Sequence, residues 1–432
     1  MSFVTRPAPS SGQSGSAAFF IGSSVVYRVI LMGGGFVALR WVPPEQLGLW
    51  QFALLLEQLL HFVRLGVPNA VNRQVPYLLG QGKPVDASAL FHVGVTYVAL
   101  CGAVLATFVA ITLLTFEFPP DQRSALIAMA ACAPLNMLNN SLEGLFRGAQ
   151  AVKKLTLCNV AMAPVALASL ALPAHYGFHG FLGRSVLFCA LQTALFLKFA
   201  PFAIRCRWEP ARVRALIKIG FPLYVWNYLN ALSLNLLAWY IGLSAGAVML
   251  GLLGPANGLL SVIALVPAAF GSYLGPLQNY DLGRGTAPAS LVARVKRLFL
   301  YALGCTALAA MAGGMLLALL VEKWLPAYGA IIDAFWVIAA VGCVRCYVVI
   351  QTVVGLFVDW WVVRNNLITL WCTRLAMLFA IWLIDAKSFT TIFSVWLAGE
   401  SLYLAVQWWQ LGVMVQRMEK RDFDGVPTHL EQ

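Results

Sequence analysis

Charged residues are scarce in this chain. Only 11% of its 432 residues are Asp, Glu, Lys or Arg, whereas 60% are hydrophobic, and the mean hydropathy is +0.79. This composition excludes a soluble globular protein and indicates that membrane spans dominate the chain. Acidic residues are scarcer than basic ones, which leaves a net charge of +12. Because the basic residues lie mostly between apolar segments, we interpret them as signals of membrane orientation and not as a nucleic-acid-binding surface.

Several motifs that carry chemistry are also missing. The chain has no G-x-x-x-x-G-K-[ST] sequence, which excludes ATP hydrolysis by a P-loop. Its nine cysteines are odd in number and irregularly spaced, so no disulfide framework is implied. Cys343 and Cys346 form a lone C-x-x-C inside an apolar segment, and we predict neither a metal site nor a cofactor. The longest loops on the predicted outer side, 116–122 and 322–328, are too short for a catalytic domain.

Apolar segments of about 20 residues recur along the chain and predict an all-α, polytopic membrane protein with about twelve spans. Internal helix breakers in the second and eighth segments suggest that these two are tilted or bent. The expected spans are 17–41, 47–79, 88–115, 124–146, 155–174, 180–201, 219–243, 247–277, 298–321, 330–355, 365–386 and 389–414.

These spans predict a chain of two halves. Residues 17–201 would form one six-helix bundle and 219–414 a second, joined by a basic cytoplasmic linker at 202–218. The polar ends, 1–16 and 415–432, are expected to be cytoplasmic tails, the first of them disordered.

The positive charges predict that both termini lie in the cytoplasm. Twenty basic residues fall on the predicted inner side, four lie within spans, and five fall on the outer side. The five outer residues are Arg40, Arg123, Arg184, Lys323 and Lys387.

An internal repeat supports the two halves. Leu47-Gly48-Leu49 recurs as Leu250-Gly251-Leu252, and Gly80-Gln81-Gly82 recurs as Gly283-Arg284-Gly285, both at an offset of 203 residues. Six spans per half is an even number, so the repeats run in the same direction and are related by an axis along the membrane normal. This arrangement predicts a central cavity between two bundles that rock to give alternating access.

The second span carries a cluster of charged residues. Glu57, His61 and Arg64 are spaced i, i+4 and i+7, which places them on one helix face, and Pro68 follows. A charge near the bilayer centre costs about 2.5–3.5 kcal/mol on insertion scales, so it is kept where it faces water, a partner or a substrate. Pro68 should free a backbone carbonyl and bend the helix. We predict a cavity lining with Glu57 and His61 in coupling; an ion pair that pins neighbouring helices is the alternative.

Further candidates lie in other spans. Arg28, Arg345 and Arg374 are intramembrane arginines, and arginine in excess over acidic residues suggests an anionic cargo, because the guanidinium fork binds two phosphate oxygens together. For each, an ion pair or snorkelling is the alternative. Tyr224, Asn227 and Asn230 of the seventh span could contact sugar hydroxyls, or could form hydrogen bonds between helices.

Four segments resemble the MOP exporter superfamily, and within it the Wzx-type polysaccharide flippases: Leu47-Gly48-Leu49-Trp50, Arg64-Leu65-Gly66-Val67-Pro68-Asn69-Ala70, Phe146-Arg147-Gly148-Ala149-Gln150 and Ile219-Gly220-Phe221-Pro222-Leu223. The resemblance is diffuse and spans the whole chain. It implies translocation of undecaprenyl-pyrophosphate-linked oligosaccharide across the bacterial inner membrane for surface polysaccharide export, with Arg28 and Arg64 holding the pyrophosphate.

We therefore expect a secondary transporter and not an enzyme, with a lipid-linked oligosaccharide and the phospholipid bilayer as its partners. A polysaccharide polymerase and the export machinery are further candidate partners. Three alternatives remain open: a cation-coupled antiporter of drugs or small solutes, a membrane polysaccharide polymerase or ligase, and a scaffold that transports nothing.

Overall fold

The computed structural model describes residues 26–420 apart from 28, 150, 284–287, 355–359 and 385–387, and these residues form helices and no strand. Residues 29–38 are helical and end in the short helix η1 (Leu39–Trp41). The helices that follow are α2 (Pro44–Leu60), η2 (His61–Arg64), α3 (Val67–Gly80), α4 (Pro84–Thr115), α5 (Pro120–Gly148), α6 (Val152–Ala168), α7 (Ala171–Lys198), α8 (Pro210–Ser244), α9 (Gly246–Ile263), α10 (Leu265–Gly283), α11 (Pro288–Trp324), η3 (Pro326–Ala334), α12 (Phe335–Val344), η4 (Arg345–Tyr347), α13 (Val348–Val354), α14 (Trp360–Leu383) and α15 (Phe389–Lys420).

Within the described ranges, eight helical stretches are long and apolar enough to cross a membrane. The all-α, multi-pass prediction is therefore confirmed. The other four expected spans differ for identifiable reasons. The first is described only in part, the second is broken at residues 61–66, the fifth corresponds to the 17-residue α6, and the seventh, within α8, carries several asparagines.

The expected segment boundaries shift at both ends of the second half. Helix α8 starts at Pro210, inside the expected linker 202–218, because proline is well placed in a helical first turn, where no N–H is required. Helix α15 continues to Lys420, beyond the expected end of the last span. The N-terminal tail lies outside the described residues.

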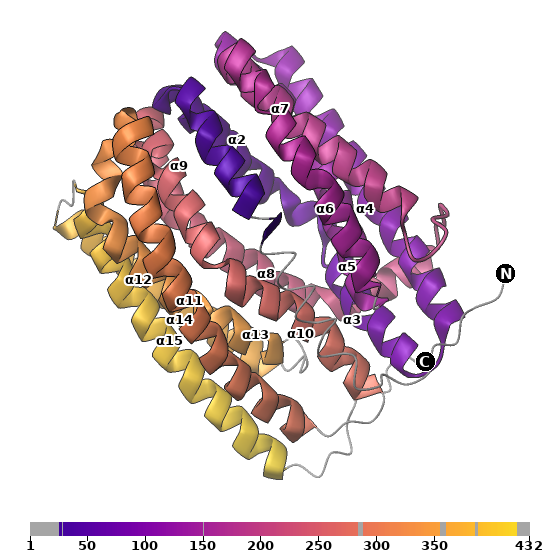
Figure 1. Cartoon of the computed structure of the whole chain (residues 1–432). Coiled ribbons are helices and arrows are strands. Elements are labelled where there is room, and N and C mark those ends of the chain that lie inside the picture. The colour runs from indigo at the N-terminus through magenta and orange to yellow at the C-terminus, as the bar shows by residue number, and fades with distance from the viewer. Residues whose placement is uncertain are drawn as a thin grey trace.

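The two halves pack through equivalent helices. Helix α2 packs on α9 and α3 packs on α10, and a shift of 203 residues places α2 on α9. Figure 1 shows α4 to α7 on one side and α11, α12, α14 and α15 on the other, with α2, α8 and α9 between them. The pseudo-two-fold axis predicted from the repeat therefore passes between α2 and α9.

Small residues allow this close approach. A Cβ placed on Gly48 would overlap the backbone of Ala247, and a Cβ placed on Gly251 would overlap the backbone of Pro44. Both pairs are equivalent under the 203-residue shift, so the contact is self-complementary, as in an isologous dimer. The Tyr328 hydroxyl adds a link between the halves by donating to a backbone carbonyl just before α2, that of Val42, at 3.0 Å.

Candidate functional site

The second span is broken where the charged residues cluster. After η2, Leu65 (φ 44°) and Gly66 (φ 85°) both adopt the left-handed conformation, and α3 begins at Val67. Leu65 is the one non-glycine residue with positive φ in the described ranges, and such residues store strain that the surroundings must hold. Pro68 lies in the first turn of α3, so the prediction that it bends a continuous helix is wrong: it starts a new one.

Two tyrosines of α8 donate to backbone carbonyls at this break. Tyr228 donates its hydroxyl to the Leu59 carbonyl at 2.7 Å, and Tyr224 donates to the His61 carbonyl at 3.3 Å. Because these two tyrosines belong to the other half, their hydrogen bonds hold the broken span and α8 in place against each other.

A second contact between the same elements is a glycine pair. A Cβ on Gly66 would lie 2.6 Å from the carbonyl carbon of Gly220 and 2.7 Å from the Cβ of Tyr224. Gly220 meets the Gly66 carbonyl in turn. Two of the segments that carry the family resemblance, around residues 64–70 and 219–223, are therefore in direct contact.

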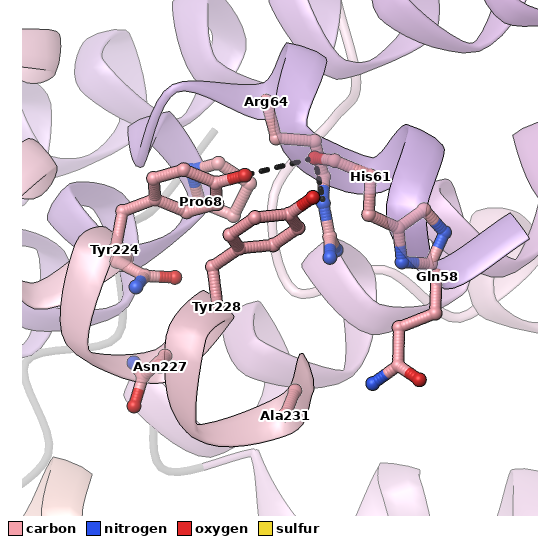
Figure 2. Close-up of a pocket in the computed structure, with 9 residues that line it drawn as sticks. Gln58, His61, Arg64, Pro68, Tyr224, Asn227, Tyr228 and Ala231 are labelled. Atoms are coloured by element: carbon pink, nitrogen blue, oxygen red, sulfur yellow. Dashed lines mark hydrogen bonds between the residues drawn. The ribbon is translucent and has the colours of Figure 1, made fainter. Parts of the chain in front are cut away.

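A cavity of about 100 Å³ lies at this junction between the halves (Figure 2). Tyr224, Tyr228 and Ala231 are spaced so that they share one face of α8 and form one wall. A share of liquid volume of about 30 Å³ per water gives room for roughly three waters. The lining residues are Gln58, His61, Arg64, Pro68, Asn69, Tyr224, Asn227, Tyr228 and Ala231.

Arg64 is the cation of this cavity. Its side chain is half-buried, its Nε donates to the His61 carbonyl at 3.4 Å, and it forms no ion pair within the described ranges. Figure 2 shows the guanidinium extending between His61 and Tyr228. A positive group held by neutral oxygens inside a polar cavity is arranged to receive an anion.

Glu57 lies one turn away from the cavity and is 5% exposed. Its Oε1 accepts from Asn136 Nδ2 at 3.2 Å and lies 3.5 Å from His61 Nε2. Of His61 and Arg64, the two basic residues on this helix face, the structure brings His61 next to the carboxylate. The two titratable groups are close enough to exchange a proton through small movements, as coupling requires.

Two of the other predicted arginines, Arg345 and Arg374, are not at this site. Arg345 Nε and Arg374 Nη1 both contact Glu400 Oε1, at 2.9 and 2.8 Å, and Arg374 stacks over Trp396 with its Cζ 4.7 Å from the ring centroid. Glu400 is fully buried. The structure therefore joins Arg345 and Arg374 to each other, within the second half, and not to Arg64.

Two further predicted site residues are Asn230 and Arg28. Asn230 does not line the cavity, and its buried Oδ1 has no partner in the described part of the chain. Arg28 lies outside the described residues. Gln58 and Tyr228 line the cavity but were not predicted from the sequence as site residues. The position of Tyr228, one turn beyond Tyr224, could have identified it. Among the described residues, no group of three His, Cys, Asp or Glu side chains is placed to hold a metal ion.

Solved structures provide the comparison that decides the fold. An outward-facing multidrug resistance MATE family transporter of the MOP superfamily aligns with a TM-score of 0.69 over 96% of this chain and 100% of its own, at 13% identity. The chain has the MATE transporter fold. A Vibrio cholerae MATE transporter aligns with a TM-score of 0.68 at 14% identity, covering 94% of this chain and 98% of its own.

A third MATE-like structure is a MOP superfamily transporter from Pyrococcus furiosus, described as having a binding pocket of reverse polarity that suggests a different function. It aligns with a TM-score of 0.67 at 12% identity and covers 96% of this chain and 100% of its own. No protein-family model matches the sequence, and no curated protein matches it either. Identities this low establish the fold alone.

Proposed function

We propose that this protein flips undecaprenyl-pyrophosphate-linked oligosaccharide across the bacterial inner membrane, with both termini in the cytoplasm. The observation that carries the proposal is Arg64: a half-buried arginine without an ion pair in the described ranges, in a polar cavity between the halves. The pyrophosphate supplies the missing negative charge. Polysaccharide polymerase and export proteins would receive the product.

The cavity walls suit the junction of phosphate and sugar. The guanidinium binds two phosphate oxygens at once, while Tyr224, Tyr228 and Asn227 offer hydroxyl and amide groups to sugar hydroxyls. At about 100 Å³ the cavity is smaller than an ordinary ligand site of roughly 300–1,000 Å³. The whole cargo therefore enters only when the halves separate, which alternating access provides.

A cation-coupled antiporter of drugs or small solutes is the second candidate. The buried Glu57, in contact with His61 and Asn136, is the observation that favours it. The MATE fold does not distinguish the flippase from the antiporter, because the chemistry of the pocket, and not the fold, determines the cargo. In the flippase proposal the same pair couples transport to protons, and Arg64 selects the cargo.

The decisive experiment measures flipping of a fluorescent undecaprenyl-pyrophosphate oligosaccharide in proteoliposomes. Arg64→Gln should reduce the rate by at least tenfold, because a hydrogen bond to a charged group contributes about 1.5–3 kcal/mol. Arg212→Gln, which removes an exposed arginine paired with Glu209, is the matched control and should flip normally.

The same vesicles separate the two candidates. If Arg64→Gln flips at the wild-type rate, the flippase proposal fails. Efflux of a cationic dye by the wild type, abolished by Glu57→Gln and untouched by Arg64→Gln, would establish the antiporter in its place.

A further inference from the structure

Arg184 is a second buried arginine in the first half. It lies two helical turns beyond the kink of α7 at Gly177, and it is 7% exposed. From the sequence, Arg184 was expected among the outer-side charges, whereas in the structure it lies inside the bundle. It is therefore a cation within the protein interior that the Arg64 cavity does not include.

Its partners are all neutral. Arg184 Nε donates to Ser169 Oγ at 3.1 Å, and Nη2 makes a long contact of 3.5 Å with the Ala166 carbonyl. Within the described ranges Nη1 has no partner and no carboxylate pairs with the group. The neighbouring first helix cannot supply one either, because the first acidic residue of the chain is Glu45.

Helix α6 compensates the charge only in part. Ala166 and Ser169 lie at its C-terminal end, where the helix dipole is equivalent to about half a negative charge. Burying an arginine without a full counter-charge is costly. If Arg184 had only a structural role, a neutral hydrogen-bond donor would be sufficient. The positive charge that remains is therefore suited to binding an anion from outside the chain.

The first helix comes directly up to this guanidinium. A Cβ placed on Gly34 would be 3.1 Å from Nη2 and 3.5 Å from the Ala166 carbonyl oxygen. Glycine at this position thus brings backbone, and no side chain, up to Arg184.

We propose that Arg184 binds a phosphate group, as a second station for the transported anion on the outward side of the Arg64 cavity. Direction follows from α7: Cys189 of this helix contacts Asn136, the partner of Glu57, and Arg184 lies more than a turn nearer the outer end. This proposal rests on the proposed function, since the cargo's pyrophosphate is the anion. A lipid phosphate has the same chemistry and is separated by the test.

The test measures binding of inorganic pyrophosphate to the purified full-length protein in nanodiscs of zwitterionic lipid. Wild type should bind at two sites. Arg184→Gln should remove one and Arg64→Gln the other, each weakening its site by about 10- to 100-fold. Arg123→Gln, an exposed outer arginine, is the control and should bind as wild type.

Gly34→Ala keeps the charge while crowding Nη2, so it should weaken the Arg184 site by a smaller factor without unfolding the protein. If Arg184→Gln retains both sites while Arg64→Gln loses one, the second station is refuted and the proposed function stands. If neither variant loses a site, both proposals fail. Repeating the titration with phosphatidylglycerol identifies the source: competition at the Arg184 site alone indicates a lipid headgroup, and its absence indicates the cargo.

Discussion

Replacing Gly220 with alanine tests whether the contact between the broken second span and α8 holds the site together. The new methyl group would lie 2.8 Å from the Gly66 carbonyl carbon, closer still to its oxygen, and 3.0 Å from the Ala70 Cβ. Ordinary contact begins at 3.4 Å, so α3 and α8 must separate by at least ~0.6 Å. Because this contact is made by the Gly66 backbone, no flexible side chain can move aside to relieve it.

The expected cost follows from overpacking, which destabilises by about 1–3 kcal/mol. Glycine to alanine inside a helix also restores about 0.5–1 kcal/mol of backbone entropy, which partly hides the clash. Gly304→Ala is the matched control, because Gly304 is an exposed helical residue whose Cβ would meet nothing within 4 Å. The difference between the two variants isolates the clash.

Thermal unfolding in detergent gives the measurement. At about 2–4 °C per kcal/mol, Gly220→Ala should melt roughly 2–12 °C below Gly304→Ala. Pyrophosphate binding at the Arg64 cavity should weaken as well, since the shift carries Tyr224 away from the His61 carbonyl. Equal melting temperatures and unchanged binding would refute the proposed role of this junction.

Three further outcomes are expected. Glu400→Gln leaves two buried guanidiniums without their carboxylate and should cost about 3–5 kcal/mol, against about 0–1 for the partly exposed pair broken by Asp281→Asn; similar melting temperatures would contradict this. Tyr228→Phe removes a 2.7 Å bond to a carbonyl at the break and should cost about 0.5–1.5 kcal/mol, and an unchanged melting temperature would argue against it. Tyr328→Phe removes the hydrogen bond to the Val42 carbonyl and should shift the population toward separation of the halves at this end by up to about tenfold, seen as longer spin-label distances between the N-terminal ends of α2 and α9; unchanged distances would show that this bond does not hold the halves together.

The sequence predicted the site in part. Arg64, His61 and Pro68 of one span and Tyr224 and Asn227 of another do line one cavity, as their polarity within apolar segments suggested. Polarity could not distinguish them from Arg345 and Arg374, which have the same residue type and comparable depth. The difference lies in Glu400, which is close to both in space but remote in sequence from Arg345.

The nature of the helix break was also beyond the sequence. Pro68 indicated an irregularity, but whether the helix bends or stops depends on partners for the released carbonyls. Two of those partners are tyrosines of α8, more than 160 residues further along the chain, and a third is Tyr97 of α4, which donates to the Val63 carbonyl at 3.0 Å. Helix propensity within one segment cannot predict a hydrogen bond whose donor lies in the other half.

By itself, the sequence determined that this protein is an all-α, duplicated membrane protein with charges inside its spans, because hydropathy, the 203-residue repeat and charge are properties of single segments. Only the tertiary structure decided which of those charges are neutralised and which are available to a ligand. Neutralisation depends on distances of a few ångströms between helices, and these are set by where glycines and tyrosines allow the halves to meet. Arg64 and Arg184 are two arginines which that packing leaves without a described carboxylate.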